Sequence, residues 1–181
     1  MHKIKTLLAM IAAISSSTIF AYDGTITFTG KIVDQTCTVS TGSDRISVTL
    51  PTVKTAVLDQ ANKTAAITPI VISLSGCNVN AAEGAKKVKA YFEPNASTDF
   101  DTGNLKNATG TGKAENVQIQ LLNSDGVTPI KLGSDFARQN VTATEVKKDT
   151  VELRYNAQYY ATAAVTPGDV SGTVNYTIAY E

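Results

Sequence analysis

The chain has 181 residues, a length typical of one domain, with 16 acidic and 16 basic side chains. Because there is no basic excess to bind phosphate groups, we do not expect nucleic acid as a partner. The sequence has no tryptophan, and its one histidine, His2, lies in a segment that we expect to be removed. Without histidine the remaining chain lacks a Ser-His or Cys-His relay and the commonest ligand of catalytic zinc. We therefore expect neither an enzyme nor a cofactor.

The N-terminal segment Met1–Ala21 has the organisation of a cleaved secretion signal. Two lysines precede the apolar stretch Thr6–Ala13, and Ser15–Ala21 ends in a small residue at which a signal peptidase can cut. A membrane anchor is the alternative, but Ile4–Ile14 is only about half as long as a spanning helix. We place the cleavage after Ala21 and expect no membrane insertion of the mature chain.

Export implies an oxidising compartment, in which cysteines pair. Cys37 and Cys77 are the only cysteines of the chain, and we expect them to form a disulfide. This bond would close a loop of about 40 residues and stabilise the fold by roughly 3 to 4 kcal/mol. The sequence has no C-x-x-C redox motif, so both cysteines are expected to be structural.

Apolar and polar residues alternate along most of the mature chain, whereas few windows have the spacing of an amphipathic helix. This pattern predicts an all-β domain. The expected strands are Thr25–Val33, Thr36–Ser40, Ile46–Leu50, Ile67–Leu74, Lys87–Phe92, Asn116–Leu122, Val151–Ala161 and Gly172–Tyr180. About seven strands in a domain of this size are typical of an immunoglobulin-like sandwich.

Residues that favour turns are concentrated between these strands. Turns are predicted at Ser40–Asp44, Asn123–Gly126 and Thr166–Gly168. The polar stretch Asn95–Lys113 predicts a long surface loop. No repeat of about 20 to 50 residues is present, which argues against a solenoid or a propeller.

The segment Gly24–Asp34 would form a strand with one apolar face. The residues on that face are Ile26, Phe28, Gly30 and Ile32. The segment is either the first strand of the sandwich or an arm that reaches a neighbour. No turn residue follows before Cys37, so the strand should run on without a hairpin. About ten extended residues span roughly 33 Å, the length of a small domain.

The last segment, Gly172–Glu181, is also predicted to be a strand with an apolar face. The residues on that face are Val174, Tyr176, Ile178 and Tyr180. A sandwich that ends on this strand, and whose first strand points outward, would lack the strand that covers its core. It would then expose an apolar groove bordered by unpaired backbone groups.

Several segments, taken together and in order, are specific to one family. They are the alternating arm with Gly30, the pair Cys37 and Cys77, the stretch Asn116–Leu121 followed by Asn-Ser-Asp-Gly126, the run Tyr155–Gly168 and the penultimate Tyr180. With these segments the mature chain resembles a chaperone-usher pilin of the type 1 fimbrial major-subunit group. The resemblance implies an incomplete immunoglobulin-like sandwich that lacks its last strand and is completed by a donor strand from a neighbour.

The resemblance also implies partners: identical or related pilin subunits, a periplasmic chaperone and an outer-membrane usher. The chaperone would lend a strand to the groove, and the arm of the next subunit, residues 22–35, would replace it at the usher. Residues 36–181 would form the pilin domain. The implied function is that of a structural subunit of a bacterial surface fimbria, exported through the periplasm, which contributes to adhesion.

The resemblance assigns roles by position in the sequence. Donor side chains would be Ile26, Phe28 and Ile32, with Gly30 as the notch where the groove is shallow. Groove-lining residues would be Val174, Tyr176, Ile178 and Tyr180, and the chaperone contacts would include Tyr180 and the Glu181 carboxylate. A glycine inside a strand can also mark a β-bulge, so this alternative stays open for Gly30.

Other functions fit parts of the sequence less well. A tip adhesin of the same family would need a second domain, for which the chain is too short. Asp99–Asn104 has alternating oxygen ligands as in a calcium loop but lacks the closing glutamate, and Asn107 replaces the first glycine of a phosphate loop that would end at Lys113. Triplets for N-glycosylation, as in a secreted glycoprotein, occur at Asn62, Asn95, Asn107, Asn140 and Asn175, but they arise by chance in a chain rich in Asn, Thr and Ser.

Overall fold

The computed structural model describes residues 26–30, 32, 37–79 and 86–181. The chain divides into two units, Met1–Lys31 and Ile32–Glu181. In the first unit, residues 26–30 form neither helix nor strand. The predicted signal Met1–Ala21 and the other residues of the predicted arm, except Ile32, lie outside the described residues.

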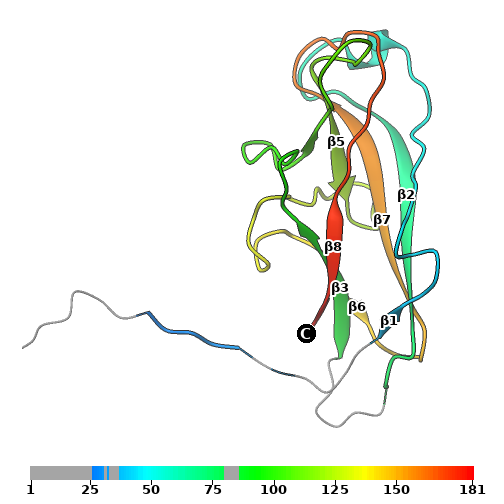
Figure 1. Cartoon of the computed structure of the whole chain (residues 1–181), viewed down its shortest axis with the longest axis vertical. Coiled ribbons are helices and arrows are strands. Elements are labelled where there is room, and N and C mark those ends of the chain that lie inside the picture. The colour runs from blue at the N-terminus through cyan, green and yellow to red at the C-terminus, as the bar shows by residue number, and fades with distance from the viewer. Residues whose placement is uncertain (1–25, 31, 33–36, 80–85) are drawn as a thin grey trace, which may run out of the picture. The chain divides into compact units, whose positions relative to one another are not determined.

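The second unit is an antiparallel β-sandwich of two sheets (Figure 1). The larger sheet has the strand order β1-β2-β7-β5-β4, and the smaller sheet has the order β6-β3-β8. The strands are β1 Thr38–Val39, β2 Thr64–Ser75, β3 Lys87–Glu93, β4 Leu105–Lys106, β5 Val117–Leu122, β6 Thr144–Glu145, β7 Val151–Ala161 and β8 Asn175–Tyr180. A short 3-10 helix, η1 at Thr55–Leu58, lies between β1 and β2 in the sequence. The long strands β2 and β7 lie side by side in the larger sheet (Figure 1).

The core lies between the two sheets because every second residue of a strand faces inward. In β7, Leu153 and Tyr155 are buried, whereas their neighbours Glu152 and Arg154 are exposed. The other strands contribute core residues that include Ile72, Leu74, Val88, Phe92 and Leu121. The Phe92 and Tyr155 rings join the two sheets edge to face, with centroids 5.2 Å apart. The alternation in the sequence therefore encodes the layers directly.

The predicted all-β class and the predicted disulfide are confirmed. Cys37 and Cys77 are bonded to each other and buried, which ties the residue before β1 to the residues just after β2. The predicted strand Val151–Ala161 is observed with the same bounds. Within the described residues, no helix is long and apolar enough to cross a membrane.

Four other predicted strands are observed with bounds shifted by one to three residues, and the remaining three differ as follows. The strand expected at Gly172–Tyr180 begins only at Asn175. The strand expected at Ile46–Leu50 is wrong, because these residues are not paired with any strand in the described part of the chain. The strand expected at Thr25–Val33 is likewise absent from its described residues, which have no pairing partner. Alternation alone shows that a segment can be a strand, whereas pairing requires a neighbour.

The surface loop predicted at Asn95–Lys113 is confirmed for most of its length, but part of the segment is buried. This segment contains β4, and Thr98, Asn104 and Leu105 are buried. The Asp99 carboxylate accepts hydrogen bonds from the backbone of Asp101 and Thr102 and from the Gln118 side chain. The hydrogen bond from the Thr102 backbone N–H is the main reason why the pKa of Asp99 is lowered. The polar residues are thus used to fold the segment onto the larger sheet.

Candidate functional site

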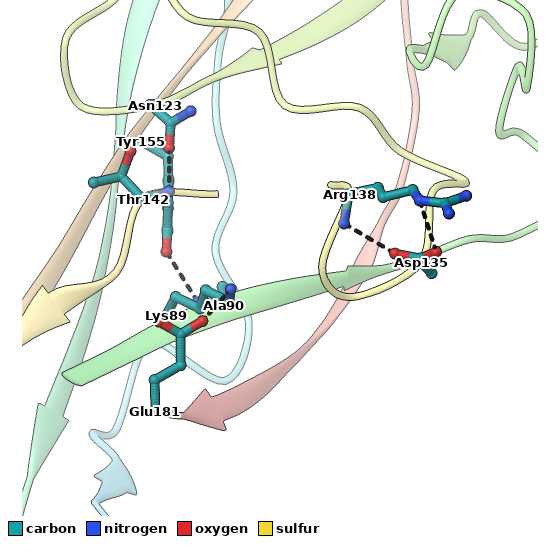
Figure 2. A network of polar contacts seen from close by, with 8 residues as sticks. All are labelled: Lys89, Ala90, Asn123, Asp135, Arg138, Thr142, Tyr155 and Glu181. Carbon is teal, nitrogen blue, oxygen red and sulfur yellow. Dashed lines mark hydrogen bonds and ion pairs between the residues drawn. The ribbon is translucent and has the colours of Figure 1, made fainter. Parts of the chain in front are cut away.

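The smaller sheet has one edge that is closed by side chains. Beyond β6, the Ala90 N–H of β3 donates to the Tyr155 hydroxyl at 2.9 Å, as Figure 2 shows. The Phe92 N–H donates to Gln139 Oε1 at 2.8 Å, and Gln139 Nε2 donates to the Phe92 carbonyl at 2.7 Å. Gln139 is fully buried. Its amide therefore replaces the backbone of a missing partner strand.

The same side of the sandwich is closed by a backbone connection between the sheets. The Ile130 N–H donates to Leu121 of β5, and the Lys131 N–H donates to Gln139, each at 2.9 Å. The Leu132 N–H donates to the Gly103 carbonyl at 2.9 Å. Because Ile130 and Leu132 are buried, this segment seals the core from solvent.

The opposite edge, formed by β8, is open. Lys87 and Glu181 exchange two backbone hydrogen bonds, of 3.1 and 2.9 Å. Since bonded and non-bonded pairs alternate along an antiparallel ladder, the N–H and C=O groups of Tyr176, Ile178 and Tyr180 point away from β3. Within the described residues, these groups have no backbone partner. The β8 edge is therefore a template for one more strand.

An apolar groove of about 820 Å³ lies beside this open edge. One wall runs from Gly172 to Tyr176, and the other is the segment Asp44–Leu50. The floor consists of core side chains from both sheets: Ile70, Ile72, Phe92, Leu105, Ile119, Leu121 and Ala157. The backbone of Asp44–Leu50 makes no backbone hydrogen bond to any described residue, so both walls offer unpaired main-chain groups. A strand between them could pair on both sides and bury its inward side chains.

Two tyrosines of β8 reach across the open side of the sandwich. The Tyr176 hydroxyl donates to the Ser43 carbonyl at 2.5 Å, and the Tyr180 hydroxyl donates to the Cys37 carbonyl at 3.1 Å. Burial raises the pKa of both hydroxyls. Tyrosine hydroxyls are protonated at neutral pH, and burial extends the pH range in which these two can donate.

The four residues that the sequence predicts for a groove wall lie on one face at the end of the chain. All four predicted apolar residues pack against the core, but only Val174 and Tyr176 line the groove. Ile178 and Tyr180 lie further along the same inner face. The Glu181 side chain forms an ion pair with Lys89, as Figure 2 shows. The C-terminal residue thus contacts its own domain.

The sequence prediction missed the second wall and one close contact. Val48 and Leu50 are half-buried in the wall, and their alternation with polar residues was a usable signal. Gly172 lies close to the groove floor, because a Cβ there would be 3.1 Å from Ile119 Cδ1. No sequence pattern marks Gly172 as a wall residue.

The predicted donor side chains are apolar and exposed. Ile26, Phe28 and Ile32 are 79%, 88% and 100% exposed. A Cβ on Gly30 would meet nothing within 4 Å, so no contact among the described residues requires glycine at this position. Exposure of large apolar side chains at alternating positions is typical of a segment that binds elsewhere.

The fold and its open edge define an all-β, immunoglobulin-like domain that lacks one strand. The chain matches the type-1 fimbrial protein A family (FimA) over residues 50–181. It is 56% identical to the F17 fimbrial protein of Escherichia coli over the whole length of both chains. It is 47% identical to the major fimbrial subunit SMF-1 of Stenotrophomonas maltophilia, over 88% of this chain and 94% of that one.

Solved structures of pilus subunits share the fold. The P pilus rod subunit PapA superposes with a TM-score of 0.63 at 21% identity, over 80% of this chain and 99% of that chain. A subunit from a chaperone-usher pilus gives the same TM-score of 0.63 at 23% identity, over 92% of this chain and 100% of that chain. The chain belongs to the type-1 fimbrial protein family. It is a structural subunit of a fimbria, the surface fibre that such subunits form.

Proposed function

We propose that this chain polymerises by donor-strand exchange, in which the arm at residues 22–35 of one subunit fills the groove of the next. This is strand addition to a sheet edge, where main-chain hydrogen bonds give affinity and alternate side chains give specificity. The observation that carries the proposal is the open β8 edge beside an apolar groove of about 820 Å³. The fibre is thus a homopolymer or a polymer of related subunits.

The arm fits the groove in chemistry and in length. Its apolar residues alternate with polar ones, which is the pattern of a strand with one face on an apolar floor. From Ile26 to Ile32 an extended chain spans about 20 Å, which is enough to cover the wall from Gly172 to Tyr176 and to continue along the β8 edge to Ile178. Burying the three large donor side chains would supply about 5 to 9 kcal/mol before the entropy of ordering the arm is subtracted.

Gly30 is then the donor residue at the shallowest part of the groove. In the free arm a Cβ at Gly30 would have no atom within 4 Å, so a larger residue would fit there. When the arm lies on the groove floor, a side chain at this position would clash with the acceptor subunit. The residues on the other face, Thr27 and Thr29, would remain in solvent.

Before assembly, a periplasmic chaperone fills the groove with its own strand, and an outer-membrane usher exchanges it for the arm. An empty groove exposes apolar surface and two unpaired edges, which favours aggregation. In this proposal the leader Met1–Ala21 is cleaved on export, and the end of β8, with Tyr180 and Glu181, contacts the chaperone. The mature chain catalyses no reaction, and the finished fimbria contributes to adhesion.

The test is to express the exported chain, Tyr22–Glu181, in a periplasm with and without its chaperone. The soluble product is sized before and after adding an excess of synthetic peptide that spans residues 22–35. We expect an unstable subunit alone, rescue by the chaperone, and a stable 1:1 complex with the peptide.

A peptide with Phe28→Arg serves as the matched control, because it has the same length and backbone but places a charge on the groove floor. It should not form the complex. A stable monomer that ignores both peptides would show that the fold needs no added strand, and the proposal would be abandoned.

A further inference from the structure

Two main-chain carbonyls on the N-terminal side of the open edge are satisfied by tyrosine hydroxyls instead of a strand. They belong to Cys37 and Ser43, each of which is only 7% exposed. The backbone around Ser43 is held in place, because Ser43 Oγ accepts the Ser73 N–H of β2 at 2.9 Å. A poorly solvated carbonyl without a donor would cost free energy. The hydroxyls of Tyr176 and Tyr180 remove this cost.

At the closed edge of the smaller sheet, side chains likewise take the place of a backbone partner, and they do so permanently. There Tyr155 and Gln139 satisfy the backbone of β3, and both are buried, at 3% and 0% exposure. Tyr176 and Tyr180 differ because they are only half-buried and lie on the strand with the free edge. Tyr176 lines the groove and Tyr180 lies further along the same face, so a strand that enters the groove and continues along the β8 edge would reach both hydroxyls.

We propose that the Tyr176 and Tyr180 hydroxyls are placeholders for backbone N–H groups of the strand that completes the domain. In the empty subunit they satisfy the carbonyls of Ser43 and Cys37, and an entering strand displaces them from these acceptors. This inference rests on the proposed function, since it assumes that a strand enters the groove. The two residues are positioning residues that set how favourable strand entry is.

The consequence of losing a placeholder hydroxyl differs between the empty and the filled subunit. Replacing a placeholder by phenylalanine keeps the ring but removes the hydrogen bond, which destabilises only the empty groove. The filled groove loses nothing, because the entering strand supplies the donor. The variant should therefore be less stable alone and bind the strand more tightly, whereas a residue with a merely structural role would weaken both.

The experiment uses the exported full-length subunit at low concentration, with a fluorescent peptide that spans residues 22–35. Affinity is measured by anisotropy for the wild type, Tyr176→Phe and Tyr180→Phe. Each variant should bind the peptide about threefold to tenfold more tightly, the range that a net hydrogen bond gives. The empty subunit is short-lived under the proposed function, so it is refolded from urea without peptide and measured at once, and the urea midpoint of each variant should lie below that of the wild type.

Two matched variants serve as controls. Tyr160→Phe removes a hydroxyl that donates to Asn62 Oδ1 outside the groove and should not change peptide affinity. Tyr155→Phe removes the acceptor of the Ala90 N–H at the closed edge and should lower stability with no gain in affinity. If a placeholder variant does not stay folded alone, exchange of labelled for unlabelled peptide from its complex gives the dissociation rate, which should equal that of the wild type.

The outcomes separate the two proposals. If the wild type binds the peptide and both phenylalanine variants bind it equally or more weakly, or release it faster, the placeholder role is overturned. If the wild type itself does not bind, donor-strand exchange fails, and the placeholder role fails with it.

Discussion

Lys89 and Glu181 form an ion pair on the outer face of the smaller sheet, where β3 and the end of β8 lie side by side (Figure 2). The Lys89 side chain is only 10% exposed, and its ammonium also lies 4.1 Å from the centre of the Phe136 ring. The C-terminal residue thus supplies the counter-charge of a nearly buried lysine.

This pair predicts an asymmetric response to mutation. Glu181→Gln should lower the free energy of unfolding by about 1 to 2 kcal/mol, between the values for exposed and buried pairs, because the Glu181 side chain is 39% exposed whereas that of Lys89 is nearly buried. Adding Lys89→Met to this variant should recover most of the loss, since the methionine keeps the apolar contact with Phe136. Urea unfolding of the two single variants and the double variant measures the coupling. Additive effects would mean that the two charges do not interact.

The arm should tolerate changes on one face only. Phe28→Arg or Gly30→Leu should leave a soluble, chaperone-bound subunit but block its addition to a growing fibre, because both place bulk or charge on the groove floor. Thr29→Arg, on the opposite face, should assemble normally. Fibre length by electron microscopy reports the result. Fibres of normal length from the first two variants would refute the donor register.

Removing the last two residues should lower the amount of subunit in the periplasm. The deletion of Tyr180 and Glu181 removes the backbone bonds between Glu181 and Lys87 and the hydroxyl bond to Cys37. Each bond is worth about 0.5 to 1.5 kcal/mol, and the proposed chaperone contact is lost as well. Immunoblots of periplasmic fractions, with and without excess chaperone, measure the effect. Unchanged levels would show that these residues do not dock there.

Alkaline pH should destabilise the domain through Tyr155. Burial raises the pKa of Tyr155 to about 12, from its ordinary value of 10.0. Because the folded pKa is the higher one, the stabilisation is complete below pH 10 and is lost as the pH rises towards 12. The loss amounts to about 2 to 3 kcal/mol. Urea midpoints between pH 9 and about 11.5 measure it, and Tyr155→Phe should show a flatter profile.

Much of the fold was predictable because apolar and polar residues alternate along each long strand. The bounds of β7 and the inward residues of β8 follow from the sequence alone. Ile46–Leu50 alternates as a strand but is unpaired among the described residues, so the strand prediction was wrong there. Alternation in one chain does not show whether a pairing neighbour is present. If the proposed strand exchange is right, the neighbour of this segment belongs to another molecule.

Other features could not be predicted because they depend on a single side chain meeting a distant strand. Gln139 comes from a polar stretch with no period, yet its amide satisfies Phe92 from 47 positions away in the sequence. Thr98 and Asn104 are polar but buried. Their segment can be buried because Gln118 and the local backbone supply hydrogen-bond partners for its polar groups. Their composition predicts loops, but it does not show which distant residues pack over them.

The disulfide has a mechanical consequence in a fibre assembled as proposed. Cys37 is the first described residue after the arm at residues 22–35, so a pull on the arm reaches the described domain at this residue. The bond to Cys77 passes that load to the end of β2, which is paired with β7 over most of its length. The disulfide therefore keeps this load off the two-residue pairing between β1 and β2. The individual subunit then resists stretching, and the inserted donor strand is the place where the fibre would break under tension.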